Sequence, residues 1–251
     1  MRTPIEISEE AGVRYLHFGS DWIQGAMRIA RPWALELDYT REMMACLLLR
    51  PEAEWPRTAL LIGLGAASLT KFLYRHRAQA KLTVVEIEAG VVAAARQCFK
   101  LPEDSARLRI EIADGVDWLA HGDRLFDLIM VDGFDAEARA GGLDTLPFYQ
   151  ACRAHLGEAG MLVVNLLGRS RGFRGSTERI RQAFDGRTLV FPSCDSGNAV
   201  AFAATGEAIR MPLTELKALA QQLKRDTGLN LLPTVARLAQ WRRCPEGLLE
   251  L

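Results

Sequence analysis

Two aspartates behind an apolar run are the side chains in this sequence best suited to do chemistry. Asp132 and Asp135 directly follow residues 126–131, in the segment Asp-Gly-Phe-Asp. Carboxylates behind a buried strand carry a desolvation cost unless they have a partner or a task. One carboxylate can take a proton from an ammonium group while the other holds charge, so the pair predicts a site for a cationic amine. The competing acid, Asp127, is more typical of a strand start.

A glycine turn and a further acid predict a nucleoside-binding site. Gly63 and Gly65 follow the apolar run 58–62 in the segment Gly-Leu-Gly. Glycine permits a sharp strand-to-helix turn and lets a ligand approach the backbone. Glu86 ends the next apolar run, where nucleoside-binding sheets carry an acid that accepts hydrogen bonds from ribose hydroxyls. A purely structural turn and a surface acid are the alternatives, and Glu88 competes with Glu86 for the ribose.

The segment Asp114-Gly115 follows the third expected strand. In a nucleoside-binding α/β sheet, the loop after the third strand lies over the adenine of the ligand. A carboxylate in that loop can accept a hydrogen bond from the exocyclic amine of the adenine. Asp114 is also a suitable N-cap for the helix that follows it. The two roles are compatible, and both stay open.

Apolar runs that alternate with helical stretches predict how these residues are brought together. Strands are expected at 58–62, 82–85, 107–112, 126–131 and 161–167, and helices at 67–77, 88–99, 115–121 and 145–156. This alternation gives right-handed βαβ units around a parallel sheet buried on both faces. The fold class is therefore α/β, with a doubly wound, mostly parallel, Rossmann-like sheet. Six residues are expected to be buried in adjacent parallel strands: Leu60, Ile62, Val84, Ile129, Val131 and Val163.

The ends of the chain carry weaker patterns. Residues 13–18 and 22–29 alternate near period two and predict short strands. A helix is expected at 39–49 with Asp38 as its N-cap. We expect residues 1–50 to form a short N-terminal β region with a linking helix, and residues 51–251 to form a nucleoside-binding α/β catalytic domain. Strands at 188–191 and 199–203 and helices at 212–225 and 230–241 complete the second region.

The charge balance argues against a nucleic-acid partner. Lys and Arg number 31, and Asp and Glu number 31. A nucleic-acid binder usually carries a basic surplus or stripe. The local cluster of Arg169, Arg171 and Arg174 is most simply a solvated loop, because charged residues are usually exposed.

Cysteine usage and hydropathy favour a soluble cytoplasmic protein with no metal and no membrane partner. The five cysteines form no Cys-x-x-Cys pair, which argues against a zinc site or a disulfide framework and favours reduced thiols: Cys46, Cys98, Cys152, Cys194 and Cys244. The N-terminus lacks an apolar signal core. No run approaches the roughly 20 apolar residues that span a bilayer.

Read in order, these motifs resemble the spermidine synthase family of polyamine aminopropyltransferases, with this sequence as a divergent member. The resemblance covers about residues 13–205 and is carried by Trp22-Ile23-Gln24, Arg41-Glu42-Met43, Leu61-Ile62-Gly63-Leu64-Gly65, Val84-Val85-Glu86-Ile87-Glu88, Asp114-Gly115, Ile129 to Asp135, and Leu143 to Tyr149. The glycine turn alone fits many methyltransferases. The Asp-x-x-Asp segment followed by Phe-Tyr is the discriminating part.

The resemblance implies a role for each matching residue. Glu86 matches the family's ribose acid and Asp114 its adenine contact, and Gln24 matches a glutamine of the cofactor pocket. Asp132 matches the general base that deprotonates the attacking amine, and Asp135 matches a contact to the substrate amine. The implied co-substrate is decarboxylated S-adenosylmethionine, whose aminopropyl group moves to a small-molecule amine such as putrescine. A homodimer is implied as well.

Two departures from the family pattern keep other functions open. The family's Gly-Gly-Gly-Asp-Gly-Gly turn has its acid at the position of Ala66, and Ala136 to Arg139 replace Pro-Val-Gly-Pro. In the family the missing acid holds the terminal amine of the cofactor. An S-adenosylmethionine-dependent methyltransferase on the same fold is therefore one alternative. A non-catalytic nucleoside-binding protein is the other, since a fold by itself does not decide function.

Overall fold

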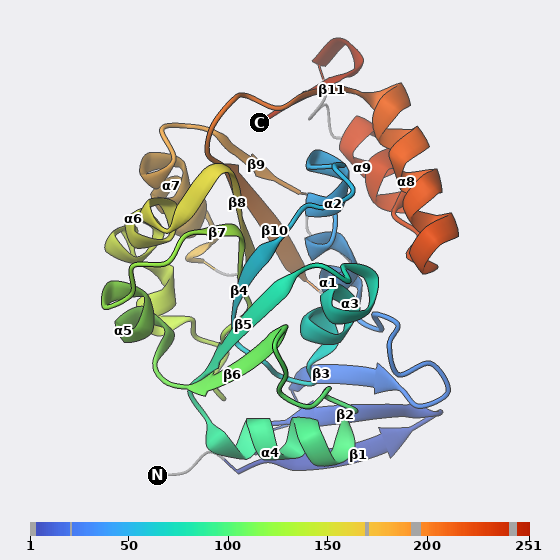
Figure 1. The fold of residues 1–251 in the computed structure, drawn as a ribbon, viewed down its shortest axis with the longest axis vertical. Coiled ribbons are helices and arrows are strands. Elements are labelled where there is room, and N and C mark those ends of the chain that lie inside the picture. Colours follow the sequence, from blue (N-terminus) through green and yellow to red (C-terminus); the bar gives the residue numbers. More distant parts are fainter. Residues whose placement is uncertain (1–3, 21, 169–170, 192–196, 241–244) are drawn as a thin grey trace.

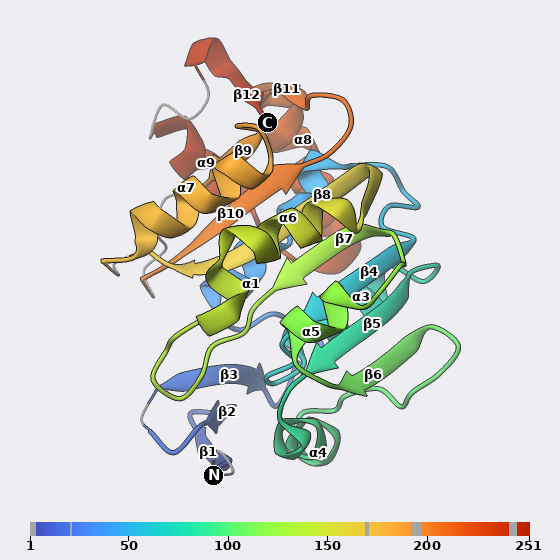
Figure 2. The same ribbon diagram turned by 90° about the vertical axis from the view of Figure 1, so that its left-hand side faces the viewer.

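A seven-stranded sheet with helices on both faces forms the centre of the molecule (Figures 1 and 2). The computed structural model describes residues 4–20, 22–168, 171–191, 197–240 and 245–251. Within these residues the strands of the large sheet are β4 Thr58–Ile62, β5 Lys81–Glu86, β6 Leu108–Ile112, β7 Phe126–Val131, β8 Leu156–Leu167, β9 Thr188–Val190 and β10 Asn198–Ala204. Their order is β6-β5-β4-β7-β8-β10-β9.

Neighbouring strands from β6 to β8 are parallel, and β10 is antiparallel to both β8 and β9. The predicted α/β class with a mostly parallel sheet is confirmed. Leu60 pairs with Ile129 and Ile62 with Val131, across β4 and β7. All six residues expected in the buried parallel strands are at most 3% exposed.

Alternation along the strands divides the core between the two faces. Helices α5 Gly115–Ala120, α6 Leu146–Ala154 and α7 Phe173–Ala183 cover the face that carries Leu60 and Ile62. The opposite face, which carries Leu61 and Val84, is covered by α1 Asp38–Met43, α2 Cys46–Leu49, α3 Ser68–His76, α4 Ala89–Cys98, α8 Leu213–Thr227 and α9 Leu232–Gln240. Successive side chains point to opposite faces, so each strand contributes to both layers.

A small antiparallel sheet packs against the glycine turn of the large one (Figure 1). Its strands are β1 Glu6–Glu10, β2 Val13–His17 and β3 Ile23–Arg28. The contact is close at Gly25, where a Cβ would lie 2.6 Å from the Cβ of Ala66. Only glycine at position 25 allows β3 to lie this near the turn, and this contact sets the small sheet beside the carboxyl ends of β4 and β5.

The region expected as one helix at 39–49 is broken, which corrects the prediction. Backbone hydrogen bonds from Met44, Ala45, Leu47 and Leu48 span three residues instead of four, so α1 and α2 are separate. The N-cap is Leu37 without a side-chain bond, and Asp38 lies inside the first turn.

Several elements carry too weak a sequence pattern to have been predicted. They are β1, α7, and the two-stranded sheet of β11 Arg210–Pro212 and β12 Leu248–Glu250. Helix α7 contains Arg174 of the supposed loop, and its buried stripe of Ser176, Ile180 and Ala183 is short. Arg171 is exposed, whereas Arg169 lies outside the described residues.

The described thiols are free. Cys46 and Cys152 are buried and Cys98 is half-buried. Cys194 and Cys244 lie outside the described residues.

Candidate active site

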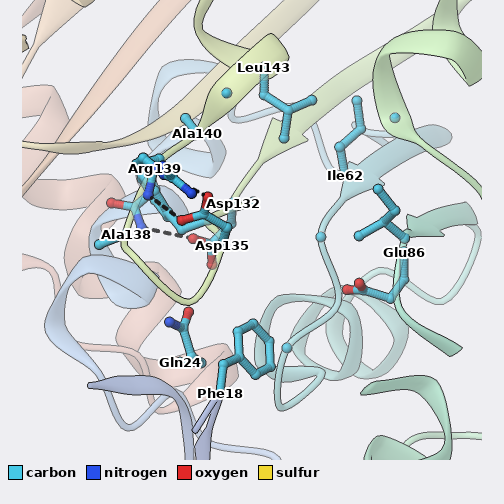
Figure 3. Close-up of a pocket in the computed structure, with 18 of the residues that line it drawn as sticks. Phe18, Gln24, Ile62, Glu86, Asp132, Asp135, Ala138, Arg139, Ala140 and Leu143 are labelled. Atoms are coloured by element: carbon cyan, nitrogen blue, oxygen red, sulfur yellow. Dashed lines mark hydrogen bonds and ion pairs between the residues drawn. The ribbon is translucent and has the colours of Figure 1, made fainter. Parts of the chain in front are cut away.

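A cavity of about 1090 Å³ lies at the carboxyl ends of the parallel strands (Figure 3). From β4 the chain first adds β5 and β6 on one side of the sheet and then returns to add β7 and β8 on the other side. The cavity therefore lies where the strand order reverses. Open α/β sheets bind ligands at this switch point. All eight site residues predicted from the sequence line the cavity: Gln24, Gly63, Gly65, Glu86, Asp114, Gly115, Asp132 and Asp135.

The glycine turn brings backbone close to the cavity because two residues adopt positive φ angles. Gly63 has φ of 94° and Gly65 has φ of 51°, a region that side chains disfavour. A Cβ on Gly63 would collide with the backbone carbonyl of Asp132. The turn and the loop after β7 therefore pack directly on each other.

Glu86 is buried at the end of β5 and holds the same turn. Its Oε2 accepts a hydrogen bond from the Leu64 N–H at 2.8 Å, and its Oε1 accepts one from the Glu88 N–H at 2.9 Å. Burial raises the pKa of Glu86, and the backbone N–H groups partly oppose that rise. The carboxylate thus has a structural role as well as a place on the cavity wall.

Asp114 is the N-cap of α5, as one of its two predicted roles requires. Its Oδ1 accepts from the Val116 N–H at 2.7 Å and from the Asp117 N–H at 3.3 Å. Gly115 begins the helix beside it. Because Asp114 also lines the cavity, capping leaves the adenine role open.

Asp132 lies deep in the cavity between two neutral donors. Its Oδ1 accepts from Asn165 Nδ2 at 2.8 Å, and its Oδ2 accepts from the Tyr39 hydroxyl at 3.2 Å. Burial raises the pKa of Asp132, and these two hydrogen bonds oppose the rise without cancelling it. A carboxylate with a raised pKa is a better proton acceptor than an ordinary one.

Asp135 lies in the same loop but has an arginine partner (Figure 3). Its Oδ1 accepts from the N–H groups of Glu137 and Arg139, and Arg139 Nε donates to its Oδ2 at 2.9 Å. Burial acts to raise the pKa of Asp135, but the backbone and guanidinium of Arg139 hold it below its ordinary value. The side chain is 42% exposed.

Gln24 reaches the cavity from the small sheet. It is half-buried in β3, and Figure 3 shows its amide directed toward the loop that carries Asp135. Ala66, the position of the family acid, is 1% exposed beneath β3. A Cβ on Gly25 would lie 2.6 Å from the Cβ of Ala66, so β3 packs closely on the position where the family carries its acid.

Carboxylates dominate the charge of the cavity wall. Within the described residues five acids line it: Glu86, Glu88, Asp114, Asp132 and Asp135. Arg139 is the one cationic side chain among those same lining residues, and it is paired with Asp135. Opposite charges attract across a low-dielectric cleft, so this wall favours a cationic ligand.

Sequence reasoning missed three residues that contact or support Asp132. Tyr39 comes from α1, Asn165 from β8 and Asn198 from the start of β10. The available signal was Asn165, a polar residue inside the apolar run 161–167. Buried polar groups need partners, so such a residue points to a network.

Among the described residues, no group of three or more His, Cys, Asp or Glu side chains is placed to hold a metal ion. No helix in this part of the protein is long and apolar enough to cross a membrane.

Comparison with known families and proteins gives a consistent picture. Residues 37–166 match the spermine/spermidine synthase domain. A polyamine aminopropyltransferase of Neisseria meningitidis serogroup B is 33% identical over 226 residues, which is 90% of this chain and 85% of the relative. The polyamine aminopropyltransferase of Chromobacterium violaceum is 33% identical over 243 residues, which is 97% of this chain and 92% of the relative.

Solved structures share the fold. A probable spermidine synthase from Corynebacterium glutamicum has a TM-score of 0.73 at 19% identity, over 88% of this chain and 83% of that one. A spermidine synthase in complex with the transition state analogue AdoDATO has a TM-score of 0.67 at 24% identity, over 94% and 85%. Human methyltransferase-like protein 13 in complex with SAH has a TM-score of 0.68 at 24% identity, over 77% and 93%.

Proposed function

This chain belongs to the spermine/spermidine synthase family, and we propose that it transfers the aminopropyl group of decarboxylated S-adenosylmethionine to a diamine such as putrescine. It is a transferase, as its relatives named polyamine aminopropyltransferase are. The observation that carries the proposal is Asp132, a carboxylate with a raised pKa in a cavity walled by acids.

Asp132 is the proposed general base. Alkylammonium groups have pKa values near 10, so a diamine is protonated at neutral pH and its nitrogen lone pair is unavailable. Asp132 takes a proton from the ammonium, and the freed amine attacks the carbon bonded to the sulfonium. The C–S bond breaks as the new C–N bond forms, its electron pair goes to sulfur, and neutral methylthioadenosine leaves. The protein holds the two substrates in line and accepts the proton.

The donor half of the cavity is proposed to bind the adenosyl group. Glu86 accepts hydrogen bonds from the ribose hydroxyls, and Asp114 accepts one from the adenine amine. The backbone of Gly63 and Gly65 lies along the ligand. Support comes from their common place on the cavity wall, with Gly115 and Gln24 beside them. These acids also favour the sulfonium charge of the donor.

Asp135 is proposed to hold the ammonium of the acceptor. Arg139 Nε donates to its Oδ2. An exposed ion pair contributes little to stability, so an arriving ammonium can replace the guanidinium at small cost.

The acceptor is expected to be a small-molecule amine. The homodimer, the cytoplasmic location and the absence of nucleic-acid and membrane partners stay predictions.

A second candidate, methyl transfer from ordinary S-adenosylmethionine, has one observation in its favour. Ala66 is buried beneath Gly25 where the family carries an acid, so no carboxylate at that position would repel the carboxylate of the ordinary donor. The aminopropyl assignment is preferred because Asp132 and Asp135 suit an amine acceptor.

The decisive experiment compares the two donors on the purified protein. Thermal shifts measured with each donor report binding, because a ligand of the folded state raises the melting temperature. Formation of methylthioadenosine with putrescine, cadaverine or spermidine reports transfer. Tight binding of ordinary S-adenosylmethionine without transfer to any of these amines would replace the aminopropyl assignment by the methyltransferase one.

A further inference from the structure

Two asparagines, here called the asparagine pair, form a line of hydrogen bonds that ends on the Asp132 carboxylate. Asn165 Nδ2 donates to Asp132 Oδ1 at 2.8 Å, and Asn198 Nδ2 donates to Asn165 Oδ1 at 3.0 Å. Asn165 is 5% exposed, and both asparagines line the cavity. Neither amide is charged, so the pair supplies a hydrogen bond to the carboxylate without bringing a cation to it.

Strand pairing explains why these three side chains meet. Asp132 follows the last β7 residue that pairs with β8, and Asn165 follows that residue's partner. Asn165 in turn pairs with Val200 of β10, and Asn198 is two residues before Val200, on the same face of that strand. Side chains at such diagonal positions share a face, and here the two amides meet at 3.0 Å. The contacts are therefore fixed by the register of three adjacent strands.

The donor and acceptor chemistry of the groups permits one orientation of the pair. An ionised carboxylate only accepts hydrogen bonds, so Asn165 must present its NH₂ group to Asp132. The carbonyl oxygen of Asn165 then faces Asn198, which must donate. A reversed Asn165 would set its oxygen against the carboxylate. The carboxylate of Asp132 therefore fixes which end of Asn165 faces it, and the bond from Asn198 holds the opposite end of that amide.

We infer that the asparagine pair positions the base so that the substrate proton is delivered to Oδ2 of Asp132. The inference rests on the proposed function, in which Asp132 is the base. Oδ1 is held by an amide that can only donate, so a proton on Oδ1 would weaken that bond. Oδ2 faces the hydroxyl of Tyr39, which can change from donor to acceptor. In the step, the ammonium N–H bond breaks, an O–H bond forms at Oδ2, and the electron pair stays on nitrogen for the attack.

Asn198 allows a test of orientation at nearly constant size. The carboxylate of Asn198→Asp would accept from Asn165 Nδ2 and turn the amide oxygen toward Asp132, whereas Asn198→Leu leaves the amide free. We expect kcat to fall roughly 3- to 10-fold in Asn198→Leu, the size of one neutral hydrogen bond, with an unchanged KM for the amine. The fall should be larger in Asn198→Asp. A packing role alone gives the opposite ranking, because Asp is the closer match to Asn in shape.

Asn165→Leu removes the donor itself. We expect kcat to fall by up to about 100-fold, the cost of a misplaced catalytic group. The acidic limb of the pH–rate profile should move to higher pH, because the Asn165 bond favours ionised Asp132. The other titratable groups that line the cavity are Tyr39 of α1, Glu86 of β5, and Glu88, Asp114, Asp135 and Arg139 of the loops.

A double variant at Asn165 and Asn198 separates an effect on the orientation of the Asn165 amide from a direct effect of the new charge at position 198. Asn198→Asp placed on Asn165→Leu should cause little further loss, because its effect passes through Asn165. An equally large further loss would mean that the new charge acts on Asp132 directly, and it would overturn the inference.

A carboxyl titration gives a readout that needs no turnover. Carbon-13 NMR of labelled aspartate carboxyls can follow Asp132, identified by the signal missing from Asp132→Asn, and melting curves check that each variant is folded. The Asp132 midpoint should rise in Asn165→Leu and Asn198→Asp. Folded variants with wild-type midpoints and wild-type rates overturn the inference. If the wild type transfers no aminopropyl group while the midpoints still rise, the proposed function fails and the positioning by the asparagine pair stands.

Discussion

Asp132 and Asp135 belong to one loop and one cavity, yet their surroundings give them opposite acid strengths. Asp132 is half-buried between an amide and a hydroxyl, and its pKa is raised. Asp135 is exposed and bound by Arg139, and its pKa is lowered. The first setting favours taking up a proton and the second favours permanent charge. Burial and partners thus give two identical side chains three residues apart opposite acid strengths, which suits the proposed roles of base and charge holder.

The test with the largest expected effect makes the same substitution, aspartate to asparagine, at Asp132 and at Asp135. Asp132→Asn should lower kcat roughly 100- to 10,000-fold, the usual cost of losing a general base. The rate should recover log-linearly as the pH approaches the pKa of the amine, because the substrate then deprotonates without help. Asp135→Asn should act mainly on the KM of the amine. Steady-state kinetics across pH measures both, and equal losses of kcat would erase the distinction.

Glu86 sharpens the comparison because it is more fully buried than Asp132 and is held by backbone N–H groups. Glu86→Ala should weaken methylthioadenosine binding by roughly 1.5–3 kcal/mol, the value of hydrogen bonds to a charged group. Isothermal calorimetry measures this change. Glu86→Gln is the matched variant, since it keeps the size of the side chain beside the turn. Unchanged affinity in Glu86→Ala would show that Glu86 is not the ribose acid.

The two aspartates should also differ in their effect on stability. A raised folded-state pKa means that folding binds the Asp132 proton more tightly, so this contribution is full below the ordinary aspartate pKa and is lost as the pH rises through the folded value. Ionised Asp132 therefore destabilises the fold at neutral pH. Asp132→Asn should melt higher near pH 7, by roughly 2–4 °C for each kcal/mol relieved, and the gain should vanish in acid.

Asp135→Asn is the control for that measurement. Its lowered pKa gives stability above the ordinary value that is lost in acid, and exposure keeps the contribution small. A melting temperature that rises equally in both variants at pH 7 would contradict the assignment of opposite settings.

The smallest expected effect comes from replacing Arg139, the cationic partner of Asp135. Arg139→Gln frees Oδ2 of Asp135 and should lower the KM of the amine a few-fold, in line with the weakness of exposed ion pairs, while kcat stays unchanged. Arg153→Gln, which breaks an exposed pair with Asp185, is the matched control. A higher KM in Arg139→Gln would instead make Arg139 part of the acceptor site.

The sequence was sufficient for features that depend on neighbours along the chain. The glycine turn follows a buried strand because Gly63 and Gly65 can adopt positive φ, and hydrophobic periodicity located the parallel strands from 58 to 167. Residues at the ends of successive parallel strands meet at one sheet edge, so Glu86, Asp114 and Asp132 could be assigned to one cavity in advance.

Elements with a sparse apolar pattern could not be predicted in this way. The buried stripe of α7 is set among arginines and glycines, which hide its period. The break between α1 and α2 falls within the wholly buried apolar run 43–49, and nothing in its composition marks the residue at which the break occurs.

What only the tertiary structure decided is the partner of each carboxylate. Tyr39 is 93 residues from Asp132 and Asn165 is 33 residues away. Strand register brings Asn165 within hydrogen-bond distance, and the packing of α1 on β8 and β10 brings Tyr39 there. Asp135 meets Arg139 through a loop conformation that residue types did not reveal. A sequence states which groups can ionise, whereas the pKa of each group depends on burial and on partners that long-range packing supplies.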